Sequence, residues 1–199
     1  MDINLNQVDG LINSFVLNVK LKFMKLANIQ ILSMIFTKET FTLSSKDLGG
    51  EATKIQEFNG FGCSGDNQSP QLSWKNAPEG TKSFAITMYD PDAPTGSGFW
   101  HWIMFDIPAN VYELVTNAGN VNLDLAPEGA IQSLTDYGIR GFGGPCPPEG
   151  HGFHQYIITV YALKVEKLGL EENINPAIVG FNLWNKALAK ASIIVYYKR

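Results

Sequence analysis

The sequence contains few residues that form covalent or ionic cross-links. Its 199 residues include two cysteines and three histidines, and 17% of them are charged. The two cysteines lack the C-x-x-C or Cys/His spacing of a zinc-binding framework. With a net charge of -4 the chain also lacks the excess of Lys and Arg that neutralises phosphates. We therefore expect no nucleic-acid partner.

Long apolar runs are also missing from the N-terminal part of the chain. Residues 11–36 are apolar but are repeatedly interrupted by Asn, Ser, Gln and Lys, so we expect no membrane span. Three lysines precede a short apolar run at 26–36, as in a secretory signal, but no small-residue cleavage site follows. Residues 1–39 are therefore predicted to be an N-terminal extension. We expect a cytoplasmic protein, with a periplasmic or secreted location as the alternative if residues 20–36 act as a signal.

From residue 40 onward the pattern predicts one β-rich domain, 40–199. The hydrophobic content of 45% is enough for a single large core. Apolar runs bounded by Gly, Pro, Asn and Asp predict strands at 41–44, 71–74, 82–89, 101–107, 131–134, 157–163 and 192–197. The predicted fold class is therefore mainly β, a β-rich α+β domain.

One helix is predicted near the C-terminus. Asn175-Pro176 combines a capping residue with proline at the first helical position. Apolar residues follow at helical spacing and are predicted to contact the core: Ile178, Phe181, Trp184 and Leu188.

The stretch from Asp90 to His101 is the first candidate site. The prolines of Asp90-Pro91-Asp92-Ala93-Pro94 end a buried strand, and His101 lies early in the next one. A carboxylate and an imidazole can then face each other across a cavity mouth. The structural alternative is an ordinary Asp-Pro turn and a core histidine whose hydrogen bonds are formed within the protein.

The second candidate site lies between residues 138 and 156. Its first half consists mainly of Gly and Pro, which allows backbone amide groups to approach a ligand. With the period of two of a strand, His154 and Tyr156 point to the same side. His151 is interpreted as a solvated loop residue outside the site.

The two cysteines lie in glycine-rich loops that flank these motifs. A disulfide between Cys63 and Cys146 would clamp the loops together, and the alternative is a pair of buried, inert thiols. Gly60, Gly62 and Gly65 match G-x-G-x-x-G, but a turn and a short strand follow where a dinucleotide site needs a helix. No nucleotide cofactor is therefore expected.

Taken together, these motifs resemble the signature regions of the phosphatidylethanolamine-binding proteins, also called Raf kinase inhibitor proteins. The resemblance is carried by residues 90–94, 100–102, 141–148 and 152–156. It is strongest to the bacterial YbhB/YbcL branch and covers roughly residues 41–199. It implies a large central β-sheet, a second small sheet, a C-terminal helix and a closing strand.

The resemblance also implies a function. Carried onto matching positions, the ligand-binding residues of the anion pocket are Asp90, His101, Gly144, Pro147, Pro148, His154 and Tyr156. The expected ligand is a small phosphorylated or oxyanionic head group, bound without catalysis, cofactor or metal. Imidazoles, a phenol and loop amides are suitable donors for an oxyanion. A kinase or protease that the protein inhibits or modulates is the expected protein partner, and a homodimer is left open.

Two other functions use the same side chains. A hydrolase would use Asp90, His101 or His154 as a general base on a phosphoester or acyl substrate, although no nucleophile motif accompanies them. A two-histidine, one-carboxylate metal site is the other alternative.

Overall fold

The computed structural model describes residues 16–27 and 39–199. The chain divides into two units between Glu39 and Thr40, and each is described separately. Residues 16–27 form a helix. Within the described ranges, no helix is both long and apolar enough to cross a membrane. Most of the apolar run considered as a signal, 28–36, lies outside the described residues.

The unit from Thr40 to Arg199 is built on antiparallel β-sheets. The largest sheet has the strand order β10 (Ala187–Tyr197), β9 (His154–Leu163), β5 (Ser83–Asp90), β6 (Phe99–Pro108) and β8 (Ile131–Gln132). The second sheet has the order β1 (Thr42–Ser44), β4 (Leu72–Lys75) and β7 (Glu113–Leu114). A short hairpin pairs β2 (Asn59–Gly60) with β3 (Cys63–Ser64), and helix α2 spans Pro176–Lys186. The predicted fold class, mainly β with a C-terminal helix and closing strand, is confirmed.

The main core lies between the five-stranded and the three-stranded sheet. β5 is the central strand of the larger sheet, and its apolar residues are buried on both faces, as a strand covered on two sides requires. Trp74 of β4 packs edge-on against Phe84 of β5, with ring centroids 5.3 Å apart. This contact joins the two sheets.

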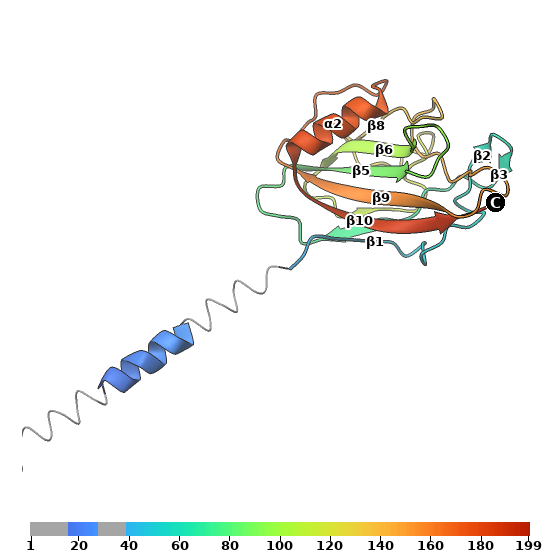
Figure 1. Cartoon of the computed structure of the whole chain (residues 1–199). Coiled ribbons are helices and arrows are strands. Elements are labelled where there is room, and N and C mark those ends of the chain that lie inside the picture. Colours follow the sequence, from blue (N-terminus) through green and yellow to red (C-terminus); the bar gives the residue numbers. More distant parts are fainter. Residues whose placement is uncertain (1–15, 28–38) are drawn as a thin grey trace, which may run out of the picture. The chain divides into compact units, whose positions relative to one another are not determined.

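Helix α2 covers the other face of the five-stranded sheet, and Figure 1 shows α2 and β1 on opposite sides of that sheet. The Asn175 side chain accepts a hydrogen bond from the amide of Ala177 at 2.9 Å, as the predicted cap requires. Val179 and Leu183 are the helix residues that pack into the core.

The predicted apolar stripe of the helix is wrong. Ile178, Phe181 and Trp184 are exposed, Trp184 to 77%. Leu188 is exposed too and belongs to β10, because the helix ends at Lys186 and the strand begins at the next residue. The helix carries two apolar stripes, and the sheet packs against the other one.

Candidate functional site

A cavity of about 170 Å³ opens where β5 ends and where β6 and β9 begin. Twelve residues line it: Phe61, Asp90, Ala93, Pro94, Thr95, Phe99, His101, Tyr137, Cys146, Pro147, Pro148 and His154. Five of the seven predicted ligand-binding residues are therefore brought together here, from segments far apart in the sequence: Asp90, His101, Pro147, Pro148 and His154. Gly144 and Tyr156 do not line the cavity.

The pairing of β5 with β9 brings Asp90 and His154 together. The two strands are antiparallel, so the last residue of β5 lies beside the first residues of β9. Asp90 Oδ2 accepts a hydrogen bond from His154 Nδ1 at 2.8 Å, and both side chains are buried. Asp90 Oδ1 accepts from the amide of Asp92 at 2.8 Å. The carboxylate therefore fixes the imidazole of His154 in one orientation.

A β-bulge in β6 places His101 in the cavity. Tyr89 pairs with Trp100 and Met88 pairs with Trp102, so His101 is the extra residue on its strand. In a regular strand, His101 and Trp102 would point to opposite faces of the sheet. The bulge breaks this alternation, and the two neighbours take the positions seen here: Trp102 packs in the main core and His101 lines the cavity.

Two carbonyl groups hold the ring of His101. Its Nδ1 lies 2.9 Å from the oxygen of Gly143 and 3.1 Å from that of Gly144. Carbonyl oxygens only accept, so the proton of the neutral ring lies on Nδ1. Burial lowers the pKa of His101, although the two carbonyls and the charge of Asp90 oppose this. His101 Nε2 has no hydrogen-bond partner among residues 16–27 and 39–199.

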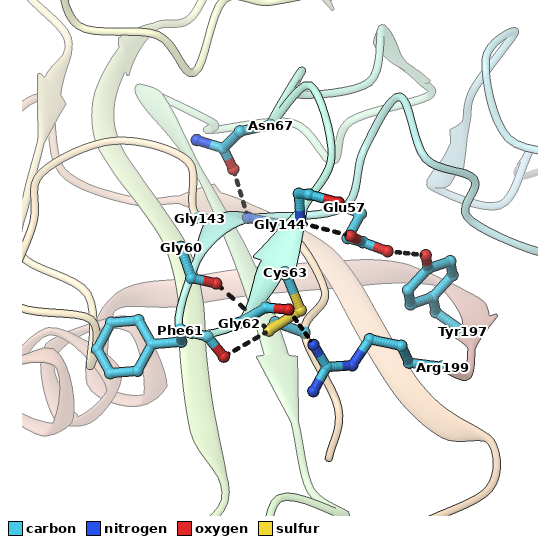
Figure 2. Close-up of a disulfide and its surroundings, with 12 residues drawn as sticks. Glu57, Gly60, Phe61, Gly62, Cys63, Asn67, Gly143, Gly144, Tyr197 and Arg199 are labelled. Atoms are coloured by element: carbon cyan, nitrogen blue, oxygen red, sulfur yellow. Dashed lines mark hydrogen bonds between the residues drawn. A yellow bond between two sulfur atoms is a disulfide. The ribbon is translucent and has the colours of Figure 1, made fainter. Parts of the chain in front are cut away.

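The glycine amides expected to bind a ligand are already engaged within the protein. The amide of Gly143 donates to the carbonyl of His101 at 2.8 Å. The amide of Gly144 donates to Asn67 Oδ1 at 2.8 Å, a contact visible in Figure 2. A Cβ on Gly144 would lie 1.7 Å from the carbonyl oxygen of Gln56. Glycine is therefore needed at position 144 for close backbone packing, and the ligand-binding role of Gly144 stays a prediction.

Tyr156 also has a different position from the one predicted. It is fully buried, with its ring centroid 5.0 Å from that of His101 and its hydroxyl without a hydrogen-bond partner in the described part of the chain. Burial raises the pKa of Tyr156, and the negative charge of Asp90 raises it further. Tyr156 packs against the ring of His101 and does not line the cavity.

Three aromatic rings of the cavity wall were missed by sequence reasoning. Tyr137 stands between Phe99 and Phe61, with centroid distances of 4.7 Å and 5.4 Å. Its hydroxyl donates to the carbonyl of Gly144 at 3.0 Å, and burial raises its pKa. Phe61 is 77% exposed at the cavity rim. No local pattern identifies Tyr137 as a site residue, because it lies in an irregular turn.

His151 was predicted to be a solvated residue outside the site. It is exposed, but its Nδ1 lies 2.8 Å from His154 Nε2. The spacing of three residues between the two histidines is the sequence feature that could have indicated this contact. His151 therefore contacts the site through His154.

Cys63 and Cys146 form a disulfide, with their Cα atoms 6.0 Å apart. Figure 2 shows this bond beside Phe61 and Gly62, in the turn between β2 and β3. Because Cys146 lines the cavity and Phe61 forms its rim, the disulfide ties two walls of the cavity together.

A buried carboxylate supports the same region. The side chain of Glu57 is fully buried and accepts a hydrogen bond from the hydroxyl of Tyr197 (Figure 2). It also accepts one from the amide of Ser64. Burial acts to raise the pKa of Glu57, but hydrogen bonds from Lys54, Tyr197 and Ser64 outweigh it, and the pKa is lowered. Glu57 therefore anchors β3 and the end of β10 as an ionised group.

The described residues contain no group of three His, Cys, Asp or Glu side chains arranged to hold a metal ion. Asp90 and His154 bond to each other instead of converging on a common point with His101. The site is built for hydrogen bonding and ring contacts.

Comparison with known proteins identifies the family. The profile of the family "Phosphatidylethanolamine-binding protein" matches residues 47–198. The UPF0098 protein YbcL of Escherichia coli (strain K12) is 47% identical over 160 residues, which cover 79% of this chain and 87% of the relative. The UPF0098 protein YbhB of the same strain is 45% identical over 157 residues, which cover 78% of this chain and 98% of the relative.

Solved structures share the fold. The crystal structure of E. coli YbcL, 46% identical, superposes with a TM-score of 0.79 and covers 81% of this chain and 99% of that one. A homologue from Chlamydia trachomatis, 26% identical, superposes with a TM-score of 0.66 and covers 80% of this chain and 98% of that one. The predicted resemblance is confirmed: this chain belongs to the phosphatidylethanolamine-binding protein family.

Proposed function

We propose that this protein is a non-catalytic binding protein for a small phosphorylated head group of the phosphoethanolamine type. One observation carries the proposal: a carboxylate, two imidazoles and three aromatic rings surround a single cavity of about 170 Å³. Pockets for drug-sized ligands usually have volumes of about 300 to 1,000 Å³. A ligand no larger than a head group therefore suits this cavity.

The lining suits the two ends of such a head group. A phosphate group that carries a hydrogen can donate it to the bare Nε2 of His101, and the imidazole of His154 is a second polar group of the lining. An ammonium group is attracted to the faces of aromatic rings, here Phe61, Phe99 and Tyr137, and to the charge of Asp90. The twelve lining residues include no Lys or Arg. The affinity for the phosphate end therefore depends on hydrogen bonds to the two imidazoles.

The hydrolase alternative lacks a nucleophile in this lining. The hydroxyl of Thr95 donates to the carbonyl of Gly98, and Cys146 is part of the disulfide. Covalent catalysis needs a hydroxyl or thiol hydrogen-bonded to a base. If the wild-type protein hydrolyses a phosphoester and His101→Ala abolishes this activity, the hydrolase alternative would be restored.

The compartment of the protein is a separate proposal. Disulfides persist in oxidising compartments and are rare in the cytosol of mesophiles. The bond between Cys63 and Cys146 therefore favours the periplasmic or secreted location over the cytoplasmic one. Fractionation of the native host combined with thiol counting tests this. A modulatory role toward a kinase or protease rests on the family resemblance.

Calorimetric titration tests the proposed ligand. Phosphoethanolamine, inorganic phosphate and ethanolamine are titrated separately at about pH 6, where phosphate groups still carry a hydrogen for a bare imidazole nitrogen. We expect saturable binding of phosphoethanolamine, weaker binding of phosphate, and loss of both in His154→Ala. Trp184→Ala, which alters an exposed helix residue, is the control and should bind like wild type. Unchanged binding in a folded His154→Ala variant would refute the site.

A further inference from the structure

A chain of hydrogen bonds connects the buried carboxylate of the cavity with the protein surface. Asp90 Oδ2 contacts His154 Nδ1, and His154 Nε2 contacts His151 Nδ1, each over 2.8 Å. His154 is 2% exposed, whereas His151 is an exposed loop residue. The imidazole of His154 is therefore bonded at both of its nitrogens.

The position of the protons determines what His154 can offer to a ligand. Its Nδ1 donates to Asp90, so in the neutral ring Nε2 carries a lone pair and accepts from His151 Nδ1. If His154 is charged, Nε2 carries a proton but donates it to His151. In both cases His151 occupies Nε2, so this nitrogen cannot bond to a phosphate ligand.

We propose that His151 is a specificity-determining residue of the cavity: its side chain is a latch on His154 Nε2, and a phosphate ligand binds by displacing it. The proposal rests on the proposed function. With the latch closed, His101 Nε2 is the remaining imidazole nitrogen of the cavity lining without a partner in the described part of the chain. Oxyanions that cannot compete with an imidazole for His154 are therefore rejected.

The surrounding contacts allow the latch to open without unfolding its loop. The backbone amide of His151 donates to the carbonyl of Pro148, and the amide of Gly150 donates to the carbonyl of Arg199, each over 3.1 Å. These bonds hold the loop backbone but leave the imidazole of His151 free to rotate toward solvent. His154 is held by Asp90 and stays in place.

Binding of inorganic phosphate at about pH 6 tests the latch, because phosphate then still carries hydrogens that a bare imidazole nitrogen can accept. His151→Ala and His151→Phe should bind phosphate about three- to tenfold more tightly than wild type, the effect expected of one hydrogen bond. His151→Phe keeps a ring beside His154 but has no nitrogen. Phe153→Ala, an exposed change in the same loop, is the control for loosened backbone.

The outcomes separate the latch from the proposed function. If wild type binds phosphate and both His151 variants bind it equally well or more weakly at about pH 6, the latch is refuted and the binding function stands. If neither wild type nor the variants bind phosphate or phosphoethanolamine at this pH, both proposals fail. An equal gain in Phe153→Ala would also refute the latch, because loop loosening would then explain the effect.

Discussion

His101 is a neutral imidazole held in a buried position, and its burial makes the folded protein less stable at acidic pH. Its pKa is lowered in the folded protein by burial. Between this lowered pKa and the ordinary value of about 6.5, the unfolded chain binds a proton that the folded protein does not bind. The free energy of unfolding therefore falls as the pH drops below about 6.5 and stops falling, for this group, below the folded-state pKa.

Replacement of His101 by Asn should remove this component. The Asn side chain retains an N–H donor for the carbonyls of Gly143 and Gly144 but does not titrate. Urea unfolding between about pH 7.5 and 5.5 should show a shallower loss of stability in His101→Asn, by up to about 1.4 kcal/mol per pH unit. Identical slopes in the two proteins would show that folding does not lower the pKa of His101.

At the residue scale, the sequence identified side-chain types better than side-chain directions. The convergence of Asp90 and His154 could be predicted, because a proline-terminated strand and a strand beginning at a glycine-rich loop meet at one edge. The bulge at His101 could not, because it leaves the composition of β6 unchanged. The position of Gly144 depends on the carbonyl of Gln56, 88 residues away in the sequence, and no local pattern encodes such a contact.

Helix α2 shows the same limit at the scale of an element. Asn175-Pro176 correctly predicted where it begins, because capping is local chemistry. Which of its two apolar stripes is buried depends on the orientation of the helix on the sheet. That orientation is fixed by Ala85, Ile103 and Phe105, which contact the stripe containing Val179 and Leu183.

Two substitutions in α2 should have very different costs. Leu183 is fully buried, so Leu183→Ala should lower the free energy of unfolding by about 2 to 5 kcal/mol. Trp184 is the next residue and is 77% exposed, so Trp184→Ala should change stability by no more than about 0.5 kcal/mol. Chemical denaturation of both variants measures the contrast. Equal losses would mean that the exposed stripe is covered in solution.

At the scale of the whole molecule, the disulfide joins segments that are 83 residues apart in the sequence. Removing such a cross-link increases the freedom of the unfolded chain and typically costs about 2 to 5 kcal/mol. We expect a double variant, Cys63→Ser with Cys146→Ser, to unfold at a lower temperature and to bind phosphoethanolamine more weakly. The second effect follows because Phe61 and Pro147 lie on the two cavity walls that the bond connects.

A reductant provides the control for the disulfide prediction. A dithiol reductant should lower the midpoint of thermal unfolding of the wild-type protein by a similar amount and should not affect the double serine variant further. If reduction leaves both stability and ligand affinity unchanged, the bond does not support the cavity. Scanning calorimetry with and without reductant distinguishes these outcomes.

The fixed orientation of the His101 ring affects which ionisation state of a ligand the resting cavity accepts. With its proton on Nδ1, the ring turns a bare nitrogen to the ligand, and a bare nitrogen needs a hydrogen from its partner. A phosphate monoester, whose second pKa is about 6, still carries such a hydrogen in part of its population near neutrality. A sulfate ester of the same shape carries none. The protein would therefore discriminate between the phosphate and the sulfate ester, because only the phosphate can donate a hydrogen to His101.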